Sequence, residues 1–535
     1  MPDFDPSHSQ AHHRPEGPSP ARLKPGIKRR IIEGIGAQTA AILLRIVQQI
    51  VLVPILIGGW GETLYAEWLV LFSAASLLSI LDGGLQIYFG NALLIARAQD
   101  DDAAFRRRFA VALCAYGVIL SIAVTVIAIG LGLSPWAGRW TAGMSNGGAA
   151  LTALGLLAAA TLIMIPFGLV TAIYRAYGDY GRGGAISIGA EAVRGLAVCV
   201  VAALGGTPPM AAGVFLGFAV MSWIFVVGDQ RRRYGPMSFV PAWPTRDELR
   251  TAALGSALYL SPTLVSPAVV NVPVLLLGLF NAPASAVVLF AVTRTFTGFV
   301  RQVVNQFSHP VGAELSRQHA GGDDSAVQRL FASAGRLISG LAGLMAGFTM
   351  VVATPFIALW THGEVSAEPG LVGVFLLTVV VGAPATVAQQ LFQYNNRPGV
   401  YAAAYAANGA LALALCVPLI QSHGALGAGM AVGIAEVMTI GLFVTRAAVT
   451  ATAVPLARYL ATSFGAAAIG LVLGGGAALG WSRMLPSDSL PGLILFAVLW
   501  AATVVVPALF VLMTRGERTW LVGAVRTRLG PGGGP

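Results

Sequence analysis

Charged residues are scarce in this sequence. Only 10% of its 535 residues are Asp, Glu, Lys or Arg, whereas soluble proteins average about 25%. Hydrophobic residues make up 56% and the mean hydropathy is +0.75. An ordinary soluble fold is therefore excluded, and we expect a membrane protein.

Cysteine is also scarce, and the motifs of metal sites and catalysis are missing. Cys114, Cys199 and Cys416 all lie inside hydrophobic runs, without a short-spaced partner, so we expect small apolar residues rather than disulfides or metal ligands. His309 and His319 have no carboxylate or cysteine at ligand spacing, and no Walker-type sequence occurs. We expect no catalytic residues, no metal, no cofactor and no enzymatic activity.

Long hydrophobic runs dominate the rest of the sequence. Runs of about 20 residues can cross a bilayer as helices. We count fourteen, at 31–57, 64–95, 109–133, 149–174, 184–205, 211–228, 252–280, 283–310, 331–360, 371–392, 399–420, 425–445, 459–481 and 490–513. The predicted fold is an all-α polytopic membrane protein with about 14 transmembrane helices.

The distribution of the basic residues that give the net charge of +10 is explained by orientation in a membrane rather than by binding to a nucleic acid. With a cytoplasmic N-terminus and fourteen crossings, 27 Lys or Arg residues fall on the cytoplasmic side, and only Arg139 and Arg483 fall on the other side. This is a strong positive-inside bias. We therefore place both termini in the cytoplasm and expect no nucleic-acid partner.

The first six helices are repeated in the next six. Val53-Pro54 returns as Val272-Pro273, and Trp140-Thr141 returns as Trp360-Thr361, with offsets that drift between 216 and 222 residues. An even-numbered repeat implies two bundles related by a pseudo-twofold axis along the membrane normal. The predicted parts are a flexible cytoplasmic tail (1–30), an N-terminal six-helix bundle (31–230), a cytoplasmic linker (231–250), a C-terminal six-helix bundle (251–447), two extra transmembrane helices (448–514) and a cytoplasmic tail (515–535).

A polar stripe is predicted on the helix at 283–310. Arg294 and Arg301 are two helical turns apart and Asn305 is four residues further on, so all three fall within about 40° of one helix face. Charges at bilayer depth are costly and usually face a polar cavity. For Arg294, the alternative is that its side chain extends to the membrane interface.

Two other helices carry polar residues on one face by the same arithmetic. In the first helix, Arg45 and Gln49 are four residues apart, and in the second Asp82 and Gln86 are four residues apart. Arg301 falls at the repeated position nearest Asp82, with an offset of 219. We therefore predict one central cavity between the bundles, in which arginines bind phosphate or pyrophosphate. Its predicted residues are Arg45, Gln49, Asp82, Arg294, Arg301 and Asn305.

Three acidic residues in the helices are candidates for coupling to a proton or sodium gradient. Asp82 is one, with a salt bridge to a neighbouring arginine as its alternative. Glu191 is the second, and its spacing from Arg194 favours a simple ion pair. Glu436 is the third and has no local partner. A neutral, hydrogen-bonded glutamic acid is the alternative there.

The opening of the chain resembles a known family. The residues that carry the resemblance are Arg45, Gln48, Pro54, Gly61, Tyr65, Trp68, Asp82-Gly83-Gly84-Leu85 and Asn91. Together they resemble the start of bacterial polysaccharide flippases, the O-antigen and lipid-linked oligosaccharide translocases of the multidrug/oligosaccharidyl-lipid/polysaccharide exporter superfamily. The plan of twelve plus two helices is similar over nearly the whole chain.

This resemblance implies a function and a location. The expected activity is transfer of an undecaprenyl-pyrophosphate-linked oligosaccharide from the cytoplasmic to the outer leaflet of a bacterial inner membrane by alternating access. Such flippases serve O-antigen or exopolysaccharide biosynthesis. The implied partners are the lipid-linked glycan, membrane lipids and a proton or sodium counter-ion. The alternatives are a drug exporter or lipid II flippase of the same superfamily, and a membrane glycan polymerase or ligase.

Overall fold

The computed structural model describes residues 25–519 except 134–140, 142, 236–238, 321, 395–397 and 486–488. Within helices, the side chains of 25–43, 45, 130–133, 180, 258, 259, 262, 313, 320, 394 and 398 also lie outside the description. The first helix begins at Pro25, inside the predicted N-terminal tail. The remainder of that tail, and 520–535, lie outside the described residues.

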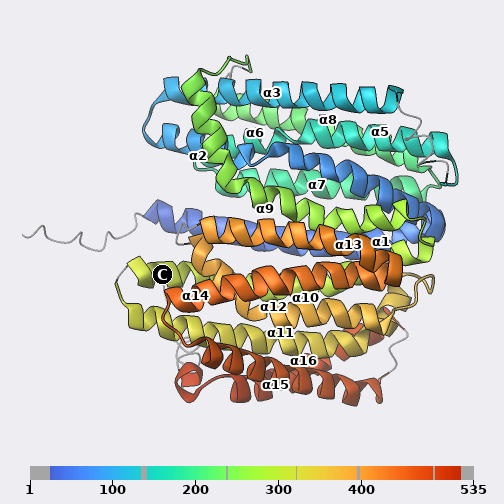
Figure 1. Ribbon diagram of the computed structural model, residues 1–535, viewed down its shortest axis with the longest axis vertical. Helices are drawn as coiled ribbons and strands as arrows, with labels where there is room; N and C mark the ends of the chain where they lie inside the picture. Colours follow the sequence, from blue (N-terminus) through green and yellow to red (C-terminus); the bar gives the residue numbers. More distant parts are fainter. Residues whose placement is uncertain are drawn as a thin grey trace, which may run out of the picture.

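Every regular element in the described ranges is a helix. In chain order the elements are α1 (Pro25–Ser76), η1 (Leu77–Asp82), α2 (Leu85–Ala98), α3 (Asp102–Leu133), α5 (Gly147–Met164), α6 (Phe167–Ala176), α7 (Tyr180–Ala203), α8 (Pro208–Tyr234), α9 (Arg246–Leu279), α10 (Ala284–Ala320), α11 (Asp324–Trp360), α12 (Pro369–Tyr394), α13 (Pro398–Glu436), η2 (Val437–Val444), α14 (Thr445–Ala451), α15 (Leu456–Ser482) and α16 (Leu490–Leu512). Figure 1 shows that most run roughly parallel to one another.

Eleven helices in the described part of the chain are long and apolar enough to cross a membrane. Two of these spans, Ile46–Asp82 and Gly399–Ala451, contain a residue with positive φ, at Gly61 (φ 71°) and Gly424 (φ 55°). Two helices meet at each break, in a conformation that glycine adopts readily. The all-α polytopic fold is confirmed, and the chain is a multi-pass membrane protein. The count of fourteen crossings stays a prediction.

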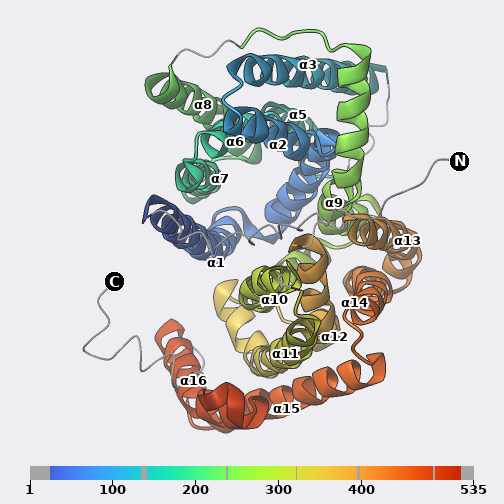
Figure 2. The same cartoon turned by 90° about the vertical axis from the view of Figure 1, so that its left-hand side faces the viewer.

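The helices form two lobes. We call residues 25–234 the N-lobe and residues 246–451 the C-lobe. Figures 1 and 2 show the N-lobe above and α10 to α14 of the C-lobe below, with α15 and α16 at the outer edge of the C-lobe. Helix α9 begins beside α3 and runs along the N-lobe down to α13 (Figure 2). The twofold relation between the lobes stays a prediction.

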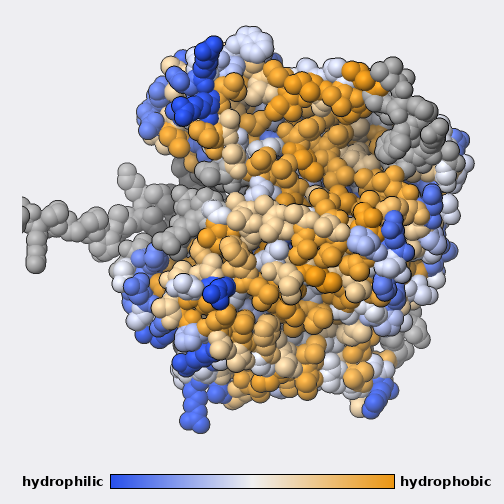
Figure 3. Space-filling view, in the orientation of Figure 1, coloured by the Kyte–Doolittle hydropathy of each residue, from blue (hydrophilic) through white to orange (hydrophobic). Residues whose placement is uncertain are grey.

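The outer surface is apolar over the middle of the helices. Figure 3 shows hydrophobic residues across the centre of one face and hydrophilic residues gathered toward the two ends of the helices. Large apolar side chains are exposed on several helices, for example Val126 of α3 (62% exposed) and Val498 of α16 (58%). Such a surface is stable where lipid replaces water.

Helix α15 approaches α11 closely through glycines. A Cβ atom added to Gly343 would lie 2.0 Å from the Ala467 carbonyl oxygen, and one added to Gly474 would lie 2.1 Å from the Leu344 oxygen. Small residues allow this approach between membrane helices. The two helices outside the repeat are therefore packed on the outer face of the C-lobe.

The lobes meet mainly along α1. The Trp360 indole Nε1 donates a hydrogen bond to the Ile50 carbonyl oxygen at 2.6 Å, and Gln302 Nε2 donates to Gln49 Oε1 at 3.3 Å. Close to the Gly61 break, a Cβ added to Gly58 would lie 3.9 Å from the His362 ring. These contacts join the lobes along residues 49–58 of α1.

The linker between the lobes is held on the N-lobe. Glu248 accepts two hydrogen bonds from the Arg107 guanidinium of α3, at 2.9 Å and 2.7 Å. Glu248 also completes a capping box with Thr245 that begins α9. The Arg107 guanidinium, together with the Thr245 backbone N–H, holds the pKa of the Glu248 carboxyl low, at about 2.

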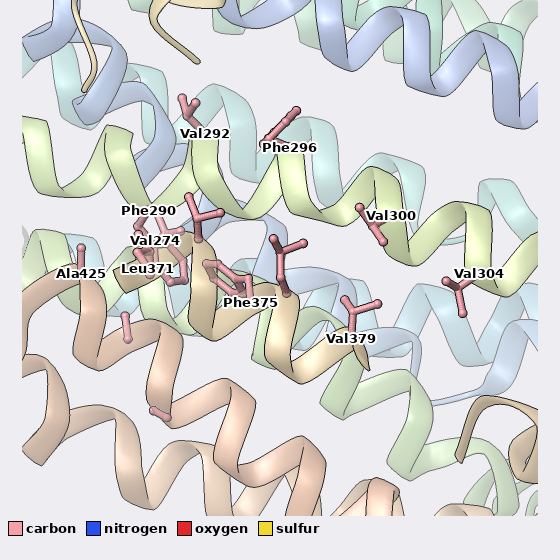
Figure 4. Packing of buried hydrophobic residues seen from close by; sticks show 14 of the residues in the cluster. Val274, Phe290, Val292, Phe296, Val300, Val304, Leu371, Phe375, Val379 and Ala425 are labelled. Carbon is pink, nitrogen blue, oxygen red and sulfur yellow. The ribbon is translucent and has the colours of Figure 1, made fainter. Parts of the chain in front are cut away.

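The core of the C-lobe forms part of a cavity wall. Val300 and Val304 lie on the side of α10 that faces Phe375 and Val379 of α12, whereas Val292 and Phe296 project from its other side (Figure 4). Phe296 stacks there on Phe356 of α11. Val304, Phe375 and Val379 also line the cavity described below. Beside them, α13 passes into the π-helical segment η2 directly after Glu436.

Candidate functional site

The C-lobe contains a polar cavity of about 370 Å³. Its walls come from α9, α10, α12, α13 and η2. The polar lining residues include Arg294, Thr297, Arg301, Asn305, Thr378, Thr386, Gln389, Tyr405, Asn408 and Glu436. All of its described lining residues belong to the C-lobe. We expected the cavity between the two bundles, and this one lies inside a single lobe.

Helix α10 supplies the predicted polar stripe. Arg294, Arg301 and Asn305 all line the cavity, as their spacing in the sequence predicts. The prediction works here because 284–320 is a continuous α-helix, so each residue advances the helix by about 100°. Whether these three residues bind a substrate stays a prediction.

Arg301 and Glu436 form an ion pair across the cavity wall. Arg301 Nη1 donates a hydrogen bond to Glu436 Oε1. The two side chains are 40% and 18% exposed, so both remain open to the cavity. The sequence shows no local partner for Glu436, but the fold supplies one from 135 residues away.

Arg294 has no acidic partner in the described part of the chain. Its Nη1 donates to the Val270 carbonyl oxygen, and its guanidinium lies 5.9 Å from the Phe290 ring centre. The cavity therefore holds two guanidinium groups and one carboxylate. Its net positive charge favours an anionic guest.

Two residues of α1 that we assigned to the cavity do not appear in its described lining. Gln49 instead bonds Gln302 at the contact between the lobes. The side chain of Arg45 lies outside the described residues, and only its place in α1 is known. Their predicted roles therefore remain predictions.

Asp82 lies in the N-lobe, away from the arginines of this cavity. Its Oδ1 accepts a hydrogen bond from the Tyr116 hydroxyl at 2.7 Å and from the Gln86 backbone N–H at 3.3 Å. Among the described side chains no arginine pairs with Asp82, and Tyr116 and a backbone N–H satisfy this carboxylate instead. The side chain of Arg45 lies outside the described residues, so the alternative of a salt bridge stays a prediction. The prediction that Asp82 and Gln86 share one face of an α-helix is wrong. Leu77–Asp82 is a 3₁₀ helix, and two glycines with positive φ follow it. The 100° arithmetic of an α-helix does not apply there.

Glu191, the third coupling candidate, lies on an exposed face of α7. Its backbone oxygen accepts a hydrogen bond from Gln48 of α1 at 3.4 Å. The nearby Arg194 guanidinium lies 5.3 Å from the Phe215 ring centre. Glu191 is absent from the C-lobe cavity lining, and a role in ion coupling stays a prediction.

Sequence reasoning missed part of the lining. Tyr405 and Asn408 of α13 face the same cavity as Arg301. They are three residues apart in an alanine-rich helix, so a polar stripe at helical spacing could have revealed them. Thr297 and Thr378 gave no such signal, because threonine is common in apolar helices.

The described residues contain no group of three or more His, Cys, Asp or Glu side chains that could hold a metal ion. Cys114, Cys199 and Cys416 are free and buried, as small apolar residues are.

Comparison with known sequences gives no relative. No family model matches the chain, and no curated protein matches it.

Comparison with solved structures gives clear fold neighbours. One is the inward-facing conformation of a multidrug resistance MATE family transporter of the MOP superfamily, with a TM-score of 0.63 and 14% identity over 76% of this chain and 95% of that chain. Another is the lipid II flippase MurJ in an inward closed conformation, with a TM-score of 0.63 and 11% identity over 88% of this chain and 98% of that chain.

The outward-facing conformation of a multidrug resistance MATE family transporter is less similar. It has a TM-score of 0.51 and 15% identity, over 79% of this chain and 94% of that chain. At these identities the likeness concerns the fold. The chain has the all-α polytopic fold that MATE transporters and MurJ share.

Proposed function

We propose that the protein is a flippase for a polyprenyl-pyrophosphate-linked oligosaccharide. It moves the lipid-linked glycan from the cytoplasmic to the outer leaflet of a bacterial inner membrane, with both termini in the cytoplasm. The pyrophosphate binds the guanidinium groups of the C-lobe cavity, while the polyprenyl tail stays in the lipid.

One observation carries this proposal. Arg294 lines a cavity within a membrane span and has no acidic partner in the described part of the chain, while the neighbouring Arg301 shares the single lining carboxylate, Glu436. An uncompensated charge at this depth is costly. A bound anion would remove that cost.

The chemistry of the side chains fits a phosphate group. Guanidinium groups bind phosphate oxygens through paired hydrogen bonds. The hydroxyl of Tyr405 and the amides of Asn305 and Gln389 line the same cavity. These groups can donate hydrogen bonds to further phosphate or sugar oxygens.

The fold neighbours support transport by alternating access. The MATE neighbours are described as transporters in inward-facing and outward-facing conformations, and MurJ as a lipid II flippase. The TM-score is higher for the inward-facing transporter, 0.63 against 0.51. We infer an inward-facing state, in which the contact between Trp360 and Ile50 helps to close the outer end.

Glu436 is the best placed of the three coupling candidates. Among Asp82, Glu191 and Glu436, only Glu436 lines the C-lobe cavity. Protonation or sodium binding there would weaken its ion pair with Arg301 and free that guanidinium for the substrate. Coupling to a proton or sodium gradient is part of the proposal.

Two other transport functions compete. A drug exporter of the same fold would bind organic cations, but the one lining carboxylate is held by Arg301, which disfavours it. A lipid II flippase uses the same pyrophosphate chemistry, so the cavity favours neither lipid. A glycan polymerase or ligase needs a catalytic constellation, and the cavity lining offers an ion pair and amides instead.

Binding of a soluble head-group probe tests the proposal. We expect farnesyl pyrophosphate to bind the purified protein in nanodiscs, and Arg294→Gln/Arg301→Gln to bind it at the cavity at least tenfold more weakly, because charge-assisted hydrogen bonds are lost. In cells, the same variant should cause finished lipid-linked oligosaccharide to accumulate in the cytoplasmic leaflet.

Arg317→Gln is the matched control, because Arg317 is 73% exposed and pairs locally with Glu314. It should leave probe affinity and glycan distribution unchanged. Normal flipping by Arg294→Gln/Arg301→Gln would contradict the proposal. An organic cation that binds this double variant more tightly than the wild type would favour the drug exporter instead.

A further inference from the structure

The N-lobe contains a second polar cavity, of about 210 Å³. It lies among α2, α6 and α7, and its polar lining residues are Gln86, Thr171, Arg175 and Ser187. Arg175 is one residue before the end of the candidate span Gly147–Ala176. The cavity is therefore near one end of the N-lobe helices.

Arg175 has no protein partner in the described ranges. Its Nε atom is buried and makes no hydrogen bond, and no carboxylate lies within ion-pair distance of its guanidinium. Two carboxylates at this end of the lobe are already engaged. Asp229 is 2.5 Å from Arg182 Nη2, and Asp179 accepts a hydrogen bond from the Tyr234 hydroxyl at 2.6 Å.

Two glycines make room for the polar side chains of this cavity. A Cβ atom added to Gly90 would lie 2.5 Å from Arg175 Nη2, and one added to Gly168 would lie 2.0 Å from the Gln86 amide. The Arg175 guanidinium therefore rests against the α2 backbone. An arginine that only extends to the membrane surface would not need Gly90.

The C-lobe has polar lining residues at corresponding positions. Gln86 and Asn305 are 219 residues apart, and Thr171 and Gln389 are 218 apart, within the range of the internal repeat. One member of each pair lines the N-lobe cavity and the other lines the C-lobe cavity. The repeat thus places a polar cavity in each lobe, and each contains an arginine without an acidic partner.

We infer that the Arg175 cavity is a second anion site, which binds a phosphate group. The guanidinium supplies the charge and paired donors, and the Gln86 amide, which has no protein partner in the described ranges, supplies another donor. The phosphate can come from a lipid head group or from free phosphate. The site goes beyond the proposed function, because it stands on the N-lobe residues alone.

Removing each site in turn tests the inference. In the Arg294→Gln/Arg301→Gln background, the N-lobe site remains, and we expect residual binding of farnesyl pyrophosphate. Adding Arg175→Gln should weaken that binding at least tenfold, whereas Arg175→Lys should retain part of it. Inorganic pyrophosphate, and nanodiscs with or without anionic phospholipid, used as competitors, identify the source of the phosphate.

A second variant keeps the positive charge of Arg175 in the cavity but changes its position. Gly90→Ala forces the Arg175 guanidinium away from α2, and we expect several-fold weaker binding. Gly155→Ala is the matched control, since a Cβ at Gly155 meets nothing within 4 Å. Thermal unfolding of each variant checks that it is folded.

The outcomes separate the two sites. No residual binding in the C-lobe double variant, or residual binding unchanged by Arg175→Gln, would overturn the N-lobe site. If Arg175→Gln abolishes binding while Arg294→Gln/Arg301→Gln has no effect, the N-lobe site stands and the proposed function fails.

Discussion

The two lobes place opposite charges at the same repeated position. Asp82 of the N-lobe corresponds to Arg301 of the C-lobe at an offset of 219 residues. Asp82 is buried and bonded to Tyr116, whereas Arg301 lines a cavity and pairs with Glu436. Two positions that the predicted repeat equates therefore carry opposite charges in different surroundings.

Among the described residues, each lobe has an arginine that pairs with a carboxylate and an arginine at a cavity that does not. In the N-lobe, Arg182 makes two hydrogen bonds to Asp229, at 2.9 Å and 2.5 Å, and Tyr174 adds a third at 2.7 Å. In the C-lobe cavity, Arg294 bonds only a backbone oxygen. Paired charges hold helices together, and unpaired charges at cavities are available to ligands.

Replacing the negative charge of Asp82 by a positive one, as at Arg301, is expected to have the largest effect on stability. Asp82→Arg places an unpaired cation in a site that is 9% exposed, and we expect a loss of about 3–5 kcal/mol in the free energy of unfolding. Asp82→Asn keeps an acceptor for Tyr116, so we expect a loss of about 1 kcal/mol. Thermal unfolding in detergent measures both. Wild-type stability of Asp82→Arg would show that the two positions are interchangeable.

The ion pair in the C-lobe gives the next largest effect. Arg301→Gln and Glu436→Gln each leave one charge without its partner, and we expect probe binding to fall about tenfold in the arginine variant only. A double-mutant cycle of unfolding free energies should give a coupling of about 1–3 kcal/mol. Independent, additive effects would mean that the pair does not form in the membrane.

The ion pair in the N-lobe tests the other half of the comparison. Arg182→Gln should lower the free energy of unfolding by about 1–2 kcal/mol, because Asp229 loses two of its hydrogen bonds. We expect binding of farnesyl pyrophosphate to remain unchanged. A loss of binding without a loss of stability would assign Arg182 to a ligand site.

The linker between the lobes gives the smallest effect, and it depends on pH. The pKa of Glu248 is lowered from 4.5 to about 2 in the folded protein, so its bond to Arg107 contributes fully above pH 4.5. That contribution is lost as the pH falls toward 2. The difference in Tm between wild type and Arg107→Gln should therefore shrink over this range. Glu248→Gln supplies the control background: the effect of Arg107→Gln on Tm should not change with pH there, because no carboxyl group remains at position 248.

Much of the fold could be predicted from the sequence. The length of the hydrophobic runs indicates which segments can cross the membrane, and the positions of the basic residues indicate which loops are cytoplasmic. The stripe of Arg294, Arg301 and Asn305 was predictable for a similar reason, since α10 is regular. Asp82 was not, because a 3₁₀ segment and Gly83-Gly84 interrupt its helix. Local geometry decided which predictions held.

Contacts between residues far apart in the sequence could not be predicted. Glu436 meets Arg301 over 135 residues, and no spacing rule connects them. The cavity in the N-lobe was missed because Gly90 and Gly168 have no side chains and only the packed helices show what they accommodate. The sequence suggested a single site between the bundles, whereas in the described part of the chain Arg294 and Arg301 line a cavity inside the C-lobe and Arg175 lines another inside the N-lobe.

The π-helical turn after Glu436 determines what surrounds this carboxylate. In an α-helix, five residues turn through about 500°, so the side-chain directions at 436 and 441 would differ by about 140°. A π turn bonds residue i to i+5 and brings the fifth residue back to the same side. Gly441 therefore joins Glu436 in the cavity lining. A Cβ atom added to Gly441 would lie 3.6 Å from the backbone oxygen of Glu436, whereas one added to Gly382 of α12 would lie 3.9 Å from its carboxylate. A side chain larger than alanine at position 382 would therefore crowd the carboxylate from the α12 side.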